Sequence, residues 1–383
     1  MDRSSDEIYM RRAMALAEKG KGFVNPNPLV GAVIVKNDEV IAEGWHEYFG
    51  GSHAERNAIK NIENSGKDWT VAGSTMYVTL EPCCHHGKTP PCTEAIIEKG
   101  VARVVVGLTD PNPKVAGKGI EQLRKAGLEV VTGVCQEEIK QQNRVFLKYI
   151  TTQRPWVVMK TAMTLDGKIA TGNGDSKWVS GEKSRYRVQA MRAEYMGVMV
   201  GIGTVRQDNP MLNVRMIEGA RQPIRIIADS RASIPPDSQV CQTAAKQATF
   251  IAHTDMAEAE QLESLHKLGV ETILCEQIWK KEGKGEQVNL NDLMLKLGVR
   301  GIDSILLEGG GELNFSFLEQ HLVDEVVAFI APKYIGGRDA KTPVEGCGWE
   351  RMADAMTLKD VSVERIGEDI VVHGYPHLSG YCN

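Results

Sequence analysis

Ser52-His53-Ala54-Glu55 and Glu81-Pro82-Cys83-Cys84-His85-His86-Gly87-Lys88-Thr89-Pro90-Pro91-Cys92 are the stretches that decide the fold of the first part of this 383-residue chain. One imidazole and two thiolates offset the charge of Zn²⁺ and leave a fourth position open for water. Zinc lowers the pKa of that water, so hydroxide is available near neutral pH. We therefore predict His53, Cys83 and Cys92 as zinc ligands. Glu55 is predicted to be catalytic, as the group that carries the proton of the water.

Both parts of the motif are predicted to stand at helix starts. Ser52 followed by Glu55 is typical of a helix N-terminus, and apolar residues recur at every fourth position after it. His53 and Glu55 would lie about 200° apart around such a helix, so we expect the metal beyond its first turn. Cys92 follows two prolines and is predicted to open a helix over residues 93–99. Two helix N-termini aimed at one ion favour thiolate over thiol.

A His-x-Glu followed by Pro-Cys and a later Cys is typical of zinc-dependent nucleobase deaminases. Their general pattern has two residues between the cysteines, whereas eight separate Cys83 from Cys92, which leaves Cys84 as a substitute ligand. Two other interpretations stay open. Ser52 and Glu55 are also the ends of a capping box, which needs no metal. The cysteines also fit a structural zinc site, closed by one of the two histidines between them.

Further motifs occur along nearly the whole chain. They are Asn25-Pro26-Asn27-Pro28, Asp110-Pro111-Asn112-Pro113, Leu165-Asp166-Gly167-Lys168 and Glu308-Gly309-Gly310-Gly311. Together with the metal motifs, they resemble the family of bifunctional riboflavin-biosynthesis deaminase/reductases, which also uses the eight-residue spacing of the cysteines. A Ser commonly occupies the place of Cys84 in that family, so the resemblance indicates Cys83 as the ligand.

The resemblance implies two reactions on small-molecule phosphoribosylaminopyrimidine substrates by a homo-oligomer. The first is hydrolytic deamination of 2,5-diamino-6-(5-phosphoribosylamino)pyrimidin-4(3H)-one. The second is NADPH-dependent reduction of the ribosyl group of 5-amino-6-(5-phosphoribosylamino)uracil to ribityl. Substrate contacts of the deaminase are expected on Pro- or Gly-flanked loops near the metal motifs, at Asn27, His46, Lys88 and Asp110.

Strands that alternate with helices predict a three-layer α/β domain over residues 1–150. A hairpin is expected to turn at Asn37-Asp38. Further strands are predicted over residues 75–80, 101–108 and 128–134, and helices over residues 119–126 and 137–149. The resemblance implies a cytidine-deaminase-like architecture for this domain.

A second α/β domain is predicted over residues 151–383, after a short polar junction at residues 151–155. The predicted strands cover residues 156–160, 198–200, 223–228, 249–252, 271–275, 304–307, 325–330 and 370–373, and the helices cover residues 183–194, 290–297 and 313–322. This alternation is a doubly wound pattern, with binding loops at the strand ends. The resemblance implies a dihydrofolate-reductase-like fold.

The best cofactor signal is the glycine run at residues 308–311, between a buried strand and an amphipathic helix. Glycines there allow a pyrophosphate to approach the backbone, although a tight strand-to-helix turn gives the same spacing. Gly201-Ile202-Gly203-Thr204 is a second candidate loop, and Ser230 follows a strand where the adenosine ribose is expected. The resemblance implies NADPH contacts at Ala162, Trp178, Thr204, Asp208, Gly310 and Gly311.

The resemblance also implies substrate contacts in the reductase at Ser176, Arg192, Leu212, Arg215 and Glu308. The two arginines suit a sugar phosphate, although a surface arginine is the alternative for each. Lys160 is expected to point from the first strand of the domain toward this site. We hypothesise that it orients or protonates the opening sugar.

Composition narrows the classes of function. The net charge is −5, and the 45 Lys and Arg residues form no long basic run, so we expect no nucleic-acid partner. Eight cysteines and no secretory apolar segment at the N-terminus predict a reducing cytoplasm, and no run is long enough for a membrane span. The rival interpretations are a tRNA or nucleoside deaminase with an unrelated C-terminal module, and a zinc-stabilised binding protein.

Overall fold

A computed structural model describes residues 3–66, 69–86, 90–112, 115–279 and 286–377. The chain forms two compact units, Met1–Gln153 and Arg154–Asn383, and each is described by itself. The border lies three residues after the position taken from the sequence, because helix α6 (Arg144–Thr152) continues into the predicted junction.

The first unit is built on a five-stranded sheet of order β2-β1-β3-β4-β5. Its strands are β1 (Gly31–Lys36), β2 (Glu39–Trp45), β3 (Thr75–Leu80), β4 (Arg103–Leu108) and β5 (Glu129–Thr132). β1 is antiparallel to β2 and β3, whereas β3, β4 and β5 are parallel. The predicted hairpin is confirmed. Asn37 and Asp38 join β1 to β2 with φ angles of 51° and 61°, the left-handed pair that a two-residue turn requires.

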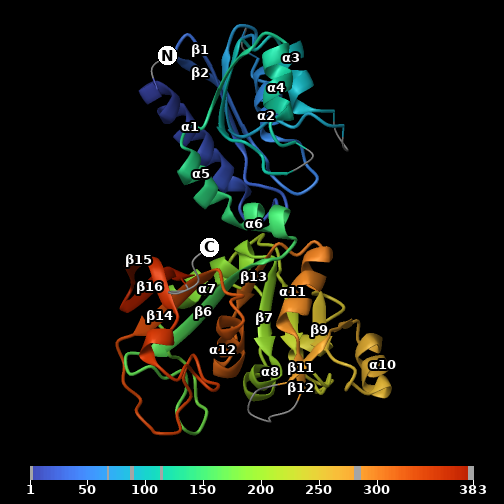
Figure 1. Ribbon diagram of the computed structural model, residues 1–383, viewed down its shortest axis with the longest axis vertical. Coiled ribbons are helices and arrows are strands. Elements are labelled where there is room, and N and C mark those ends of the chain that lie inside the picture. Colours follow the sequence, from blue (N-terminus) through green and yellow to red (C-terminus); the bar gives the residue numbers. More distant parts are fainter. Residues whose placement is uncertain (1–2, 67–68, 87–89, 113–114, 280–285, 378–383) are drawn as a thin grey trace. The chain divides into compact units, whose positions relative to one another are not determined.

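Helices cover both faces of this sheet (Figure 1), and alternate residues of its strands pack against the two helix layers. On one face, Val33 and Val105 pack with α1 (Arg3–Ala17), α5 (Gln136–Gln142) and α6. On the other, Ala32 and Val104 pack with α2 (Ala54–Glu63), α3 (Cys92–Glu98) and α4 (Lys118–Lys125). A short 3₁₀ turn, η1 (Glu18–Gly20), follows α1. The predicted three-layer α/β class is thus confirmed.

Two local predictions for this unit are wrong. The single helix expected over residues 137–149 is broken at Asn143, because its side chain accepts a hydrogen bond from Leu29 N at 2.8 Å and donates one to Leu29 O at 3.0 Å. The capping box is also wrong. His53, rather than Ser52, is the N-cap of α2, and no side chain caps that helix.

The second unit is built on a nine-stranded sheet of order β10-β9-β8-β7-β13-β6-β14-β16-β15, with a separate hairpin. The sheet strands are β6 (Trp156–Thr164), β7 (Gly197–Gly201), β8 (Ile224–Ala228), β9 (Thr249–His253), β10 (Glu271–Leu274), β13 (Ser304–Leu307), β14 (Glu325–Ala331), β15 (Thr357–Ile366) and β16 (Asp369–His377), and the hairpin is β11 (Gln277–Trp279) and β12 (Glu286–Val288). From β10 to β14 all neighbours are parallel, whereas β16 and β15 are antiparallel.

Helices cover both faces of this sheet, so the doubly wound α/β class is confirmed (Figure 1). α11 (Leu290–Val299) and α12 (Gly311–Glu319) pack on one face, and α8 (Ile202–Asp208), α9 (Gln239–Gln242) and α10 (Ala259–Lys267) pack on the other. The remaining helices are α7 (Glu182–Glu194) and the 3₁₀ turn η2 (Met352–Asp354). None of the helices in the described parts of the chain has the length and apolar character that crossing a bilayer requires.

The sequence missed α8, α9, α10, β15 and the hairpin strands β11 and β12. The second candidate loop is in fact the end of β7 and the first turn of α8, since Gly201 closes the strand and Ile202 begins the helix. β15 has an almost wholly exposed surface, so no apolar alternation marks it as a strand.

Candidate active sites

The first unit brings together the three side chains predicted to bind zinc. His53 Nδ1 lies 3.4 Å from Cys83 Sγ and 3.4 Å from Cys92 Sγ, and all three donor atoms lie within 4.8 Å of one another. Tetrahedral zinc, with bonds of about 2.3 Å to sulfur and about 2.0 Å to nitrogen, separates its ligands by similar distances. The donor set therefore fits Zn²⁺ with a fourth position left for water.

Each donor stands at the end of a regular element. His53 is the N-cap of α2 and has extended backbone, with φ −74° and ψ 161°. Cys92 is the first residue of α3, and its backbone N–H donates to Cys83 Sγ at 3.3 Å. Cys83 follows the end of β3 by three residues. Two helix N-termini thus meet at the cluster, where their dipoles favour negative charge on sulfur.

The charges in this cluster are tightly linked. A hydrogen bond from the Cys92 thiol, with further support from His53, lowers the pKa of Cys83 to about 4. The hydrogen bond with Cys83 raises the pKa of His53 to about 9. Glu55 is only 3% exposed, and this burial raises the pKa of its carboxyl group. A carboxyl group with a raised pKa, next to a thiolate site, is suited to both accepting and donating a proton.

Two of the predicted substrate residues lie beside the metal ligands. The His46 ring meets the His53 ring edge-on, with centroids 5.7 Å apart. His46 Nδ1 donates to Ser52 O at 3.0 Å, so its Nε2 accepts from the Asn27 side-chain amide at 3.1 Å. Burial lowers the pKa of His46, which keeps the ring neutral. Asn27 and His46 therefore form a fixed polar wall next to His53.

Asp110 and Lys88 are the other two residues predicted to contact the substrate of the deaminase. Asp110 is 8% exposed and accepts from Asn112 N at 2.8 Å, and burial raises its pKa. Lys88 lies outside the described residues. Exposed His86 pairs with Glu94 at 3.0 Å rather than closing a metal site. Within the described residues, Cys84 does not join the donor cluster.

In the second unit, a cavity of about 630 Å³ opens at the C-terminal ends of parallel strands β7, β8 and β13. Of the predicted cofactor residues it is lined by Thr204, Asp208, Ser230, Gly310 and Gly311, and of the predicted substrate residues by Ser176. The two glycine-bearing segments therefore line one cavity, and they lie next to each other, since a Cβ atom at Gly310 would be 3.7 Å from Thr204 Oγ1. Ala162 and Trp178 do not line it. Ala162 lies within β6, and Trp178 is 60% exposed with Arg185 stacked over its ring.

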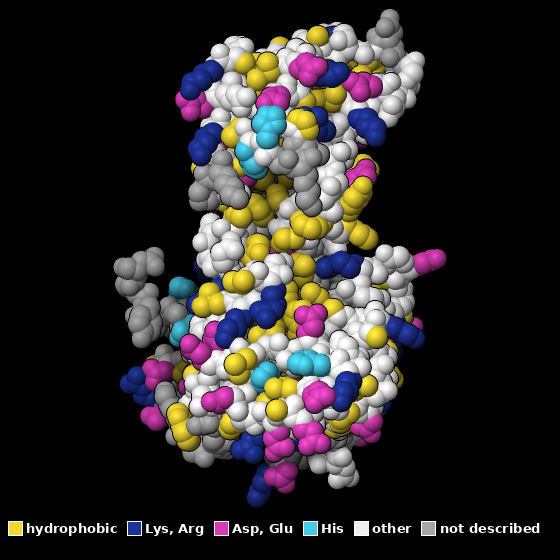
Figure 2. Space-filling model, turned by 90° about the vertical axis from the view of Figure 1, so that its right-hand side faces the viewer, with side chains coloured by type: hydrophobic (Ala, Val, Ile, Leu, Met, Phe, Trp, Pro, Cys, Tyr) yellow, Lys and Arg dark blue, Asp and Glu magenta, His cyan; other side chains and the backbone are white. Residues whose placement is uncertain are grey.

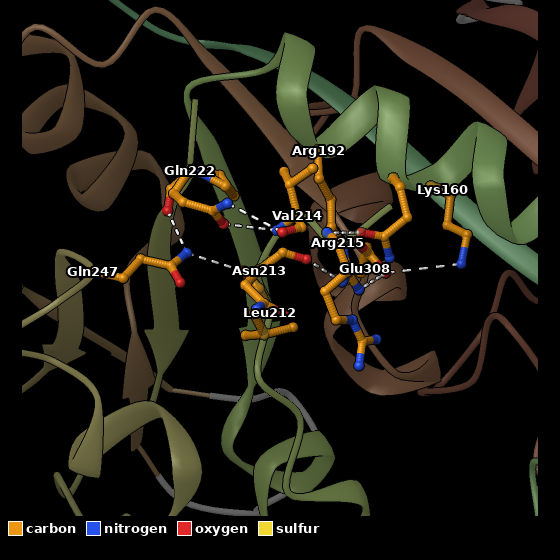
Figure 3. Close-up of polar contacts among 11 residues, drawn as sticks. Lys160, Arg192, Leu212, Asn213, Val214, Arg215, Gln222, Gln247 and Glu308 are labelled. Carbon is orange, nitrogen blue, oxygen red and sulfur yellow. Dashed lines mark hydrogen bonds and ion pairs between the residues drawn. The ribbon is translucent and has the colours of Figure 1, made fainter. Parts of the chain in front are cut away.

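Three of the other predicted substrate residues, Lys160, Arg192 and Glu308, form a charged cluster, and Glu308 directly precedes the glycine run. Figure 3 shows the Glu308 carboxylate between two cations. Arg192 binds it with two hydrogen bonds of 2.6 and 3.0 Å, and Lys160 Nζ lies 3.8 Å away. Burial alone would raise the pKa of Glu308, but Arg192 and Lys160 outweigh it and lower the value to about 2. Burial lowers the pKa of Lys160 itself.

A neighbouring loop completes this cluster (Figure 3). Arg192 Nη1 donates to Asn213 O at 3.1 Å, and Gln222 bonds both backbone groups of Val214. Leu212 is buried, with a left-handed φ of 50°, and the backbone N–H of exposed Arg215 donates to Gln189. The loop is thus held rigidly while the guanidinium of Arg215 stays at the surface.

Sequence reasoning missed two residues that shape these sites. Glu81 is a buried carboxylate that accepts backbone hydrogen bonds around the cysteine loop, and Gln189 accepts from Arg215 N at 2.7 Å. An acidic residue directly before Pro-Cys and two glycines further on were a usable signal for Glu81. No spacing marks Gln189, since α7 meets the loop only in the folded unit.

Fold and sites together define a class of protein. A His-Cys-Cys donor set at two helix N-termini, next to a buried glutamate, belongs to a zinc-binding deaminase domain. The doubly wound second unit, with its glycine-walled cavity, is a nucleotide-cofactor domain. The chain is therefore a two-domain enzyme of the zinc deaminase and reductase type.

Comparison with known proteins agrees with this class. Residues 3–108 match the cytidine and deoxycytidylate deaminase zinc-binding region, and residues 155–372 match the RibD C-terminal domain. The riboflavin biosynthesis protein RibD of Actinobacillus pleuropneumoniae is 52% identical over 368 residues, which cover 96% of this chain and 94% of that protein. The chain belongs to the RibD family of bifunctional deaminases and reductases, and it is both a hydrolase and an oxidoreductase.

Two solved structures are similar over nearly the whole chain. One is the diaminohydroxyphosphoribosylaminopyrimidine deaminase/5-amino-6-(5-phosphoribosylamino)uracil reductase of Thermotoga maritima, with a TM-score of 0.85, 39% identity and coverage of 98% of this chain and 99% of that one. The other is RibD of Acinetobacter baumannii, with a TM-score of 0.86, 34% identity and coverage of 98% and 100%.

Proposed function

We propose that this chain carries out two consecutive steps of riboflavin synthesis. Its first unit deaminates 2,5-diamino-6-(5-phosphoribosylamino)pyrimidin-4(3H)-one, and its second reduces the ribosyl group of 5-amino-6-(5-phosphoribosylamino)uracil to ribityl with NADPH. The observation that carries the proposal is the convergence of His53, Cys83 and Cys92 beside buried Glu55. The name of the Thermotoga maritima relative supplies the two substrates.

In the deaminase, His53 Nδ1, Cys83 Sγ and Cys92 Sγ hold the zinc ion. Zinc bound there supplies a Lewis acid that makes water a nucleophile near neutral pH. Glu55 takes a proton from the attacking water and returns it to the amino group that leaves as ammonia. Its burial supports this role, because a carboxyl group with a raised pKa can act in both directions.

The pyrimidine is held by the polar wall beside the ligands. Asn27 and neutral His46 offer an amide and an imidazole to the ring heteroatoms, and their mutual hydrogen bond fixes both orientations. Asp110 is assigned to the exocyclic amino groups of the pyrimidine, because a carboxylate accepts the hydrogen bonds that these groups donate. Lys88 is assigned to the phosphate on charge alone.

In the reductase, NADPH is assigned to the glycine-walled cavity, where it supplies the hydride. Gly310 and Gly311 allow its pyrophosphate to approach the backbone at the N-terminus of α12. Thr204, Asp208 and Ser230 line the same cavity and contribute polar contacts. Ala162 and Trp178 remain assigned by family resemblance.

The sugar is assigned to the charged cluster next to that cavity. Lys160 has a pKa lowered by burial, so it can lose a proton to the ring oxygen as the sugar opens. Glu308 holds Lys160 and Arg192 in place, Leu212 belongs to the neighbouring loop, and Ser176 is assigned to the substrate from the wall of the cofactor cavity. Arg192 already uses its donors on Glu308 and Asn213, so exposed Arg215 is the better anchor for the phosphate.

Further parts of the proposal concern partners and compartment. The substrates are small pyrimidines, the protein is a homo-oligomer, and no nucleic acid is bound. On the face shown in Figure 2, Lys and Arg are interspersed with Asp and Glu, which supports the absence of a nucleic-acid footprint. None of the cysteines in the described part of the chain forms a disulfide, which supports a reducing cytoplasm.

The test gives the zinc-loaded protein the diaminopyrimidinone ribotide, with and without NADPH, and follows products by mass spectrometry. We expect loss of ammonia without NADPH and a gain of two hydrogens only when NADPH is present. Deamination without any reduction would return the second unit to an unrelated module and favour a nucleoside or tRNA deaminase. Zinc binding with neither reaction would leave the metal structural.

A further inference from the structure

Glu81 directly follows β3 and is 4% exposed. Its Oε1 accepts from Gly119 N at 2.9 Å and Ile120 N at 3.2 Å, and its Oε2 accepts from Asp110 N at 3.1 Å and Gly117 N at 2.9 Å. One buried carboxylate therefore satisfies four backbone N–H groups, two of them in the first turn of α4. Such a network is costly to break, because each released donor would be left in a dry environment.

The close approach of α4 to the cysteine loop is a second, independent feature. A Cβ atom added at Gly119 would lie 2.2 Å from Pro82 O, and the preceding Gly117 has a left-handed φ of 85°. Only glycine permits this approach. The N-terminus of α4 is thus pressed against the residues that immediately precede Cys83.

The other cysteine is tied to the same helix. Thr93 follows Cys92 and is fully buried, and its N–H donates to Cys83 O at 3.2 Å. Its hydroxyl lies 3.0 Å from Oε1 of Gln122, which belongs to α4. The loop before Cys83 and the start of α3 at Cys92 are therefore both attached to α4, a helix that contributes no donor atom to the cluster.

We propose that Glu81 is a positioning residue of the deaminase site. By locking α4 to the loop before Cys83, it sets the distance between the thiol groups of Cys83 and Cys92. Its hydrogen bond from Asp110 N also fixes the position of the Asp110 carboxylate, which is assigned to the substrate. The inference rests on the proposed zinc site and adds the frame that gives the donors their geometry. Residues that orient metal ligands from outside the ligand set commonly change metal affinity by about 10- to 100-fold when they are replaced.

The experiment compares Glu81→Gln with Glu121→Gln. Glu121 lies on α4, the helix that Glu81 binds, is 64% exposed and pairs only with Lys125 among the residues described, so it is a matched control. Zinc release from each full-length protein is followed with a chromogenic chelator, and the Co²⁺-substituted proteins are compared by visible absorption. We expect Glu81→Gln to release zinc about 10- to 100-fold faster and to alter the thiolate–cobalt bands, whereas Glu121→Gln matches the wild type.

Separate measurement of KM and kcat for deamination, together with the reductase activity, completes the test. Because Glu81 also holds Asp110, KM for the pyrimidine should rise in Glu81→Gln, while reduction by the second unit is retained. Unchanged zinc release, cobalt bands and KM would overturn the proposal. If Glu81→Gln fails to fold, Thr93→Val removes the other attachment, and wild-type zinc release in that variant would also overturn it. A wild-type protein without zinc would instead refute the proposed function.

Discussion

The two sites of this chain are built in different ways. The deaminase donors come from three short segments within residues 53–92, and each stands at the end of a helix or strand. The reductase cavity is lined by segments spread from Ile169 to Glu345, brought together at the ends of parallel strands. A metal site can therefore be identified from local motifs, whereas a cofactor cavity depends on how the whole sheet is assembled.

The difference is also electrostatic. In the deaminase, burial outweighs the charge of nearby His53 and raises the pKa of Glu55. In the reductase, buried Glu308 lies between Arg192 and Lys160, and its pKa falls to about 2. The first carboxyl group is adapted to exchange protons and the second to stay charged. The same substitution at Glu55 and at Glu308 should therefore have different effects.

The largest expected effect follows from Glu55→Gln. The amide keeps the shape of the side chain but cannot take a proton from water, so kcat for deamination should fall by about 10³-fold. Zinc content and the reduction of added 5-amino-6-(5-phosphoribosylamino)uracil should be unchanged, as measured by metal analysis and NADPH absorbance. Exposed Glu63→Gln on the same helix is the control. Retention of wild-type deamination would remove Glu55 from the mechanism.

The next largest effect tests whether the first unit can be destabilised without loss of activity in the second unit. Asp6 in α1 is 3% exposed and receives two hydrogen bonds of 2.8 Å from Arg103 and one of 2.9 Å from Tyr77. Asp6→Asn removes the buried charge partner of Arg103 and leaves it only the exposed carboxylate of Glu129 among the residues described, so it should destabilise the first unit by about 3 kcal/mol. Calorimetry should show one transition lowered while reductase activity persists.

The pH dependence of this contribution has a definite sign. Burial alone would raise the pKa of Asp6, but Arg103 and Tyr77 lower it below its value in the unfolded chain. Its stabilising contribution is therefore present above the unfolded pKa and is lost as the pH falls through the folded pKa. Asp6→Asn should abolish that acid-side loss. An equal shift of both calorimetric transitions would show that the units do not unfold separately.

What could be read from the sequence follows the same division. The strand at Thr75–Leu80 and the helix start at Cys92 were predicted closely, because turn residues and prolines mark them locally. The cluster of His53, Cys83 and Cys92 was predicted from the chemistry of the donors, and the family resemblance favoured Cys83 over Cys84. Glu81 was missed because its partners, Gly117 to Ile120, become neighbours only when β3 and α4 pack together.

In the second unit, the glycine run and several other lining residues of its cavity were predicted, but not all the elements that carry them. Residues 304–307 form the strand that was predicted, yet α8 was read as a loop, because Gly201 before it and Gly203 within it outweigh the helix pattern of its seven residues. The bidentate pair of Arg192 and Glu308 spans 116 residues, so no local pattern reports it. Propensity and periodicity describe elements, whereas these contacts depend on topology.

A smaller effect tests the reductase side of the comparison. Lys160→Met keeps the length of the side chain but removes its proton, so reduction should slow by about 10²-fold while deamination is unchanged. Since burial lowers the pKa of Lys160, wild-type reduction should fall as pH rises through that value, and the variant should lose this limb. Exposed Lys267→Met is the control. A variant with the wild-type rate and pH profile would exclude Lys160 as the acid.

The smallest expected effect asks whether contacts beyond the motifs affect the deaminase at all. Asn143 is 2% exposed, and its side chain satisfies both backbone groups of Leu29, two residues after Asn27. Asn143→Ala leaves those groups unpaired and should cost about 2 kcal/mol, which lowers the melting temperature of this unit by about 5 °C. Asn64→Ala, at the exposed end of α2, should change neither quantity. Below the transition, kcat for deamination should stay at the wild-type value, because the donors around His53 are fixed by other bonds. If kcat falls with stability intact, the site is less local than its motifs imply, and the contrast with the reductase cavity weakens.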